Sequence, residues 1–302
     1  MGEALDACRF VHFTAAMLLF GIAAFRLYAL PGNADGAAAK ILAGFDAYFG
    51  QVLLIVSFVA LASAVALLIS QTAEMTGSLA AAMDVAALDA VLFDTRFGRV
   101  WCGHLLLAAI LVLACCYRQP RRPVVLILAF GLLASLGWIG HAAMEEGAAR
   151  AGHELNQTGH LLAAGLWLGG LVPLAWFLRR TGRLPDEISL VSLALRNFSH
   201  MGYAAVAVIA LTGAVNTFLL VGSFGALLGT AYGRLLVVKI LLFIAMVGVA
   251  SVNRFHLAPQ ISVEPGALGA LRRTVAFEQC LGLAVLAVVS VLGTWPPAFH
   301  GH

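Results

Sequence analysis

The feature that most constrains this chain is a series of long apolar stretches. A transmembrane helix needs about 20 consecutive, mostly apolar residues. The sequence has eight such runs, near residues 8–30, 47–71, 97–117, 122–143, 157–178, 198–222, 232–254 and 273–295. Only 11% of its residues are charged, against about 25% in an average soluble chain. The sequence therefore predicts an all-α, polytopic membrane protein with eight transmembrane helices, and it excludes a soluble enzyme, a nucleic-acid-binding protein and a secreted disulfide scaffold.

The distribution of basic residues predicts the orientation in the membrane. Cytoplasmic loops of membrane proteins carry an excess of Lys and Arg. With both termini on the periplasmic side, twelve basic residues are cytoplasmic: Arg26, Lys40, Arg118, Arg121, Arg122, Arg179, Arg180, Arg183, Arg196, Arg254, Arg272 and Arg273. Five are periplasmic: Arg9, Arg96, Arg99, Arg150 and Arg234. We therefore expect a multi-pass protein of the bacterial inner membrane with both termini periplasmic.

The two halves of the sequence resemble each other, which predicts a parallel internal repeat. The segment that begins at His12 aligns with the one that begins at His160, and Thr95-Arg-Phe-Gly-Arg99 aligns with Thr230-Ala-Tyr-Gly-Arg234. In this alignment His104 falls where Lys239 falls. We expect a single integral-membrane domain over 1–302, made of a first four-helix half (1–150) and a second four-helix half (151–302). Four helices per half gives both halves the same orientation.

Histidines gather at the predicted periplasmic side. Four of the predicted helices each bring one histidine to nearly the same depth: His12, His104, His141 and His160. Ionisable side chains within a membrane are functional candidates, and helical bundles build metal sites from inward-pointing ligands on different helices. The sequence therefore predicts a metal site of these four histidines. Further contacts are expected from Cys8, Cys102, Met144, His153, His300 and His302.

Two other interpretations of the same histidines stay open. Imidazole suits copper, zinc and iron, and the nearby sulfur atoms favour Cu(I), but pairs of histidines on facing helices also ligate haem b. A single histidine near the end of a span can equally be an interfacial residue or a hydrogen bonder between helices. The spacing in the sequence does not separate copper from haem.

Three more polar residues lie within the predicted spans: Lys239, Asn216 and Glu278. Lys239 and Asn216 fall at similar depth, so we expect a hydrogen bond between them. Glu278 lies near the cytoplasmic end of the last span, where an ion pair with Arg196, Arg254 or Arg272 is the favoured interpretation and proton coupling the alternative. Nucleotide-binding and hydrolase motifs are absent, which predicts that the chain is not an enzyme.

Several segments resemble the CopD family of bacterial copper-resistance membrane proteins. They are HLLAAGLWLGGLVPL from His160, RNFS from Arg196, GAVNTFLLVGS, TAYGRLLVVKILLF from Thr230, Asn253-Arg254 and the closing VLGTWPPAFH. The resemblance is dense over about 157–300 and weaker in the first half. It implies an eight-span inner-membrane protein that handles copper with a periplasmic CopC-like partner. It also implies metal-binding roles for His12, His141 and His160, whereas His104 rests on its depth and on the repeat.

The sequence thus predicts a protein that binds copper, as Cu(I) or Cu(II), and carries it from the periplasm across the membrane. Copper would enter through a histidine site near the periplasmic face, and replacing His160 by Ala is expected to abolish bound copper. The first alternative is a haem b cytochrome with bis-histidine ligation. The second is a membrane partner of a periplasmic copper protein that does not itself transport. In all three the expected surroundings are membrane lipid, and nucleic acid is not a partner.

Overall fold

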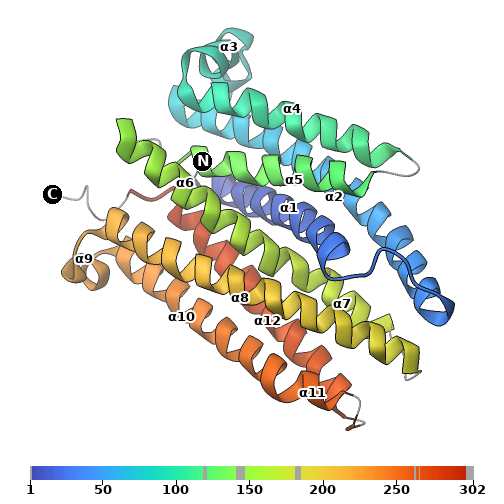
Figure 1. Ribbon diagram of the computed structural model, residues 1–302. Helices are drawn as coiled ribbons and strands as arrows, with labels where there is room; N and C mark the ends of the chain where they lie inside the picture. Colours follow the sequence, from blue (N-terminus) through green and yellow to red (C-terminus); the bar gives the residue numbers. More distant parts are fainter. Residues whose placement is uncertain are drawn as a thin grey trace.

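The computed structural model describes residues 2–117, 121–140, 147–180, 185–261, 263–264 and 266–296, and within these ranges it is helical without strands (Figure 1). The first half contains α1 (Gly2–Tyr28), α2 (Gly36–Thr76), α3 (Val85–Asp94), α4 (Arg96–Cys116) and α5 (Arg122–Ser135). Short 3₁₀ turns occupy Ala81–Met83 and Leu136–Trp138. The second half contains α6 (Gly147–Ala164), α7 (Gly170–Arg180), α8 (Pro185–Val221), α9 (Phe224–Gly229), α10 (Ala231–Val252), α11 (Ala258–Gln260) and α12 (Ala267–Leu292). Two π-helical turns, Gly165–Gly169 and Asn253–Leu257, continue α6 into α7 and α10 into α11.

Seven helical segments of the described residues are long and apolar enough to cross a membrane: Gly2–Tyr28, Gly36–Thr76, Arg96–Cys116, Gly147–Arg180, Asp186–Val221, Ala231–Gln260 and Ala267–Leu292. The remaining expected span, near 122–143, is the shorter apolar helix Arg122–Trp138, and its predicted end at 141–143 lies outside the described residues. The all-α membrane fold is therefore confirmed. The number of eight spans, the periplasmic termini and the repeat remain predictions.

Two helices are much longer than the apolar runs that predicted them. The run near 47–71 is part of the 41-residue α2, and the run near 198–222 is part of the 37-residue α8. Apolar composition marks only the part of a helix that lies in hydrocarbon, whereas a helix continues into polar sequence until a breaker stops it. Pro185 occupies the first helical position of α8, where its missing N–H costs nothing.

A short surface helix precedes a spanning helix in each half, and both junctions are built alike. Thr95 caps α4 by accepting a hydrogen bond from Gly98 N at 2.9 Å, and Thr230 caps α10 by accepting one from Gly233 N at 3.0 Å. A Cβ atom at Gly98 would collide with the backbone of α3, and one at Gly233 would collide with the backbone around α9. The shared Thr-x-x-Gly sequence therefore encodes the same cap and the same close backbone contact twice.

The first helix, α1, lies in the middle of the bundle and joins the two halves (Figure 1). It packs against α2 and α5 on one side and against the π turn Gly165–Gly169, α7 and α12 on the other. Gly21 and Gly169 are in direct backbone contact, since a Cβ atom on either would overlap the backbone of the opposite segment. Glycine at such positions lets two membrane helices approach closely.

We predict that Gly169→Ala destabilises the protein by wedging α1 away from the π turn. A Cβ at this position would meet the carbonyl oxygen of Met17, which is backbone and cannot rotate aside. Overpacking of this kind costs about 1–3 kcal/mol, so the thermal unfolding midpoint in detergent should fall. The matched control is Gly248→Ala, because a Cβ there meets nothing within 4 Å. Equal midpoints for the two variants would contradict the close contact.

Candidate metal-binding site

Two buried histidines face each other inside the first half. His12 lies on α1 and His104 on α4, and neither side chain has exposed surface. Their Nε2 atoms are 2.9 Å apart, and their ring planes make an angle of 60°. The fold thus brings together two imidazoles that are 92 residues apart in the sequence. A buried polar group needs a partner, so every ring nitrogen of the pair must be accounted for.

A serine fixes the other nitrogen of each ring. His12 Nδ1 lies 2.9 Å from Ser63 Oγ of α2, and His104 Nδ1 lies 2.7 Å from Ser135 Oγ of α5. Each hydroxyl has one hydrogen, and each lies within 2.8 Å of a backbone carbonyl of the preceding helical turn, to which it donates. Both hydroxyl oxygens therefore accept from an Nδ1–H group. In this assignment both Nε2 atoms carry a lone pair, so their contact has room for one shared cation, either a proton or a metal ion.

An indole ring holds His104 in this orientation. Trp101 stacks on the His104 ring with a centroid separation of 4.5 Å and an interplanar angle of 10°. Its own Nε1 donates to the carbonyl oxygen of Ala64 on α2 at 3.0 Å. Trp101 was not among the residues predicted for the site, although its spacing of three from His104 on a helix places the two on one face. No sequence signal distinguished Ser63 or Ser135 from other serines of apolar helices.

The remaining predicted ligands do not join this pair within the described residues. No group of three or more His, Cys, Asp or Glu side chains that could hold a metal ion occurs there. Cys8 and Cys102 are half-buried free cysteines. His153 is buried and lies away from this pair, in the lining of a cavity that Gln157 and Asn216 also line. The other predicted ligands lie outside the described residues: His141, Met144, His300 and His302.

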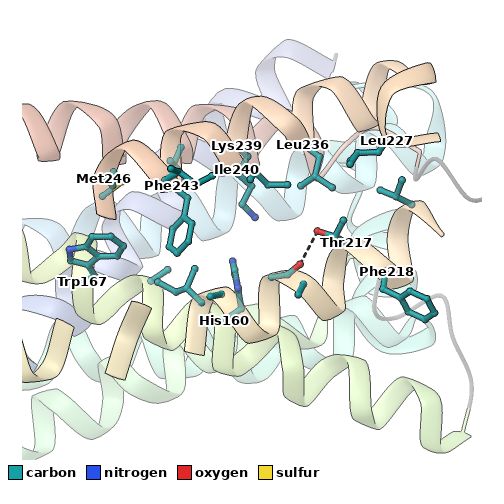
Figure 2. Close-up of a pocket in the computed structure, with 18 of the residues that line it drawn as sticks. His160, Trp167, Thr217, Phe218, Leu227, Leu236, Lys239, Ile240, Phe243 and Met246 are labelled. Carbon is teal, nitrogen blue, oxygen red and sulfur yellow. Dashed lines mark hydrogen bonds between the residues drawn. The ribbon is translucent and has the colours of Figure 1, made fainter. Parts of the chain in front are cut away.

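His160 lies in a different place from the His12–His104 pair. Its Nδ1 is 2.9 Å from Thr212 Oγ1, and the Thr212 hydroxyl donates to the carbonyl oxygen of Val208 at 2.5 Å. His160 Nε2 is therefore the lone-pair nitrogen. The ring lines a cavity of about 660 Å³ between α6, α8 and α10, with Lys239 on the opposite wall (Figure 2). The structure thus separates His160 from the site in which the sequence had placed it.

The intramembrane polar residues have partners other than those expected. Asn216 accepts from Asn156 Nδ2 at 2.8 Å and donates to Gln157 Oε1 at 2.9 Å, whereas a bond to Lys239 was predicted. The Glu278 carboxylate accepts from two neutral donors in place of the expected arginine.

Both donors to Glu278 come from π-helical turns. Trp167 Nε1 lies 2.8 Å from Glu278 Oε1, and Asn253 Nδ2 lies 3.1 Å from Glu278 Oε2. Trp167 belongs to the turn Gly165–Gly169 and Asn253 to the turn Asn253–Leu257. π turns often occur at functional sites, but sequence periodicity does not reveal them. The carboxylate is only 2% exposed, so these two bonds replace the water that burial removes.

Comparison with known proteins places the chain in a family. The family model described as copper resistance protein D-like, N-terminal domain, matches residues 1–151, and the model described as copper resistance protein D matches residues 192–292. Copper resistance protein D of Pseudomonas syringae pv. tomato is 32% identical to the chain over 96% of both proteins. The chain belongs to the copper resistance protein D family. It is accordingly a multi-pass protein of the inner membrane with a copper-related function.

Two further relatives extend this picture of the copper resistance protein D family. The inner membrane protein YebZ of Escherichia coli is 30% identical over 96% of the chain and 97% of its own length. The copper transport protein CutJ of Bacillus subtilis is 29% identical over 98% of the chain but only 53% of its own length. No solved structure matches the chain.

Proposed function

We propose that this protein binds copper between His12 and His104 and moves it across the inner membrane. The observation that carries the proposal is the contact between two Nε2 atoms, which lie 2.9 Å apart in a fully buried position. Two imidazole nitrogens at this distance must share a cation, which is either a proton or a metal ion. Imidazole nitrogen is a good ligand for copper, and the family relatives include proteins named for copper resistance and copper transport.

A copper ion fits between the rings with a small movement. Metal–imidazole bonds are about 2.0–2.1 Å long, so two nitrogen ligands of one ion stand about 3.3–4 Å apart, depending on the angle at the metal. The rings would separate by about 1 Å or less. Ser63 and Ser135 would keep both Nδ1–H groups engaged, which is how outer-shell partners of metal-bound histidine hold the tautomer and the ring orientation.

The copper site of this proposal is smaller than the four-histidine site predicted from the sequence. His12 and His104 form its core, and His141 remains a proposed third ligand outside the described residues. His160 is assigned another role, because it faces a separate cavity. Cys8 and Cys102 stay outside the coordination sphere, since their side chains do not group with the histidine pair.

The arrangement of the pair favours copper over haem b. A copper ion requires the two Nε2 atoms to move apart by about 1 Å. A haem requires an empty space between α1 and α4 that is large enough for the whole porphyrin ring. Trp101 is stacked on His104 and is itself 1% exposed, so the space beside the pair is filled. Bis-histidine haem ligation by His12 and His104 would require the first half to repack.

Transport in this proposal starts at the periplasmic side. With both termini periplasmic, His12 lies ten residues into α1, about 15 Å along the helix from its periplasmic end. A periplasmic CopC-like protein would deliver copper there. The onward path is the contact between the halves, which is closed at Gly21 and Gly169, so transport requires the halves to move. The paired caps at Thr95 and Thr230 support the proposal that these halves are parallel repeats.

We predict that His12→Ala and His104→Ala each abolish copper binding, whereas His160→Ala and His200→Ala retain it. Each of the first two variants leaves only one imidazole, which cannot supply both ligands of the buried site. His160 lies outside that site, and His200 is exposed. The measurement is copper content per protein by elemental analysis after loading and desalting in detergent. An absorption spectrum of the same samples tests for haem, since a Soret band at about 400–430 nm would support the cytochrome alternative. Loss of copper in His160→Ala with retention in His12→Ala would refute the proposed ligand pair.

We also predict that cells producing the wild-type protein accumulate more copper than cells producing His104→Ala at equal membrane abundance. The variant keeps the periplasmic surface on which a copper protein would dock, but it lacks one proposed copper ligand. A difference in accumulation would therefore come from transport and not from docking. Elemental analysis of washed cells after growth in copper provides the measurement. Equal accumulation in both strains would favour the non-transporting membrane partner.

A further inference from the structure

The cavity beside His160 is a long apolar groove along the second half. Its lining runs from Trp167 at one end to Leu227 at the other (Figure 2). Along α8 it extends from Ile209 to Val221, which is about 18 Å at the rise of an α-helix. A volume of about 660 Å³ spread over this length suits a chain-like molecule. Most of the lining side chains are apolar, so the chain would be a hydrocarbon.

Two polar groups in the middle of this groove lack partners in the part of the chain that the structure describes. Lys239 Nζ is a donor with no hydrogen bond or ion pair there, and His160 Nε2 is a lone-pair acceptor, since its Nδ1–H is engaged with Thr212. Figure 2 shows both side chains pointing toward each other across the cavity. The other hydroxyl groups of the lining already form hydrogen bonds within the protein: Thr217 donates to the carbonyl oxygen of Gly213, and Ser223 caps α9.

An unpartnered lysine inside a membrane is costly and marks a functional position. Lys239 lies eight residues into α10, about 12 Å from the end of that helix. With the start of α10 at the membrane surface, this depth is below the level of phospholipid headgroups. A ligand that satisfies Lys239 therefore carries its polar group within the hydrocarbon layer. That group must accept from an ammonium and donate to an imidazole nitrogen.

We propose that this groove binds a lipid-borne quinol, a hydroquinone ring with a long hydrocarbon tail. One ring hydroxyl meets both requirements, because its hydrogen is donated to His160 Nε2 and its oxygen accepts from Lys239. Phe243 provides an aromatic wall near the ring, Trp167 closes that end of the groove, and the tail follows the apolar groove between α8 and α10. This site is independent of the copper pair, which lies in the first half.

The test is the thermal stabilisation of the detergent-purified full chain by a decyl-tailed ubiquinol kept reduced under anaerobic conditions. A ligand that binds only the folded state raises the unfolding midpoint. We expect a saturable rise for the wild type and at least a tenfold weaker apparent affinity for Lys239→Met and for His160→Leu. Lys40→Met and His256→Leu are the matched controls, since both residues are exposed and outside the groove, and they should respond as the wild type does.

Two further measurements keep the result independent of folding defects. Gly213→Leu leaves both polar groups in place and fills the groove beside His160, where an added Cβ meets only the ring at 3.6 Å, so it should bind the quinol at least tenfold more weakly. The dimethyl ether of the same quinol cannot donate a hydrogen bond and should stabilise the wild type far less. The proposal is overturned if quinol and ether stabilise equally, if all variants respond as the wild type does, or if the purified protein shows a Soret band that His160→Leu removes.

Discussion

The backbone contact between Gly21 and Gly169 is the constraint on which the rest of the structure depends. It holds α1 in the centre of the bundle, where it touches α2 and α5 of the first half and α7 and α12 of the second. Because lipid is as apolar as the helix surfaces, close packing and polar contacts hold such a bundle together. The position of α1 also fixes the depth of His12, so the contact between the halves and the proposed copper site are parts of one arrangement.

The polar residues buried in the two halves of the chain differ in their chemistry. In the first half, His12 and His104 are in contact, and both rings are held by serines and by Trp101. In the second half, His160 faces Lys239 across an open cavity. A pair of neutral histidines offers two nitrogen ligands to a metal ion, whereas a lysine ammonium group repels a metal ion. In the predicted repeat, Lys239 stands where His104 stands, and this difference would suit the first half to a cation and the second half to a neutral ligand with a hydroxyl group.

The all-helical membrane fold and its main apolar segments could be predicted from the sequence, because hydrophobic length is a direct physical requirement of the bilayer. The site could be predicted only in part. Depth along a helix placed His12, His104 and His160 at one level, but it carries no information about which helices are neighbours or how each is rotated. The helix contacts decide that His104 meets His12 and that His160 faces away. The partners of Glu278 were unpredictable for a related reason, since the π turns that present Trp167 and Asn253 shift the helical register locally.

X-ray absorption of the copper-loaded, detergent-purified protein tests the central claim most directly. The account predicts two imidazole nitrogen ligands per copper at about 2.0 Å, together with the outer-shell scattering that imidazole rings produce. It predicts no shell of sulfur atoms at about 2.3 Å. Any further light-atom ligand would be His141 or solvent. A sulfur shell would place Cys8, Cys102 or a methionine on the metal, and the absence of imidazole scattering would contradict a site between His12 and His104.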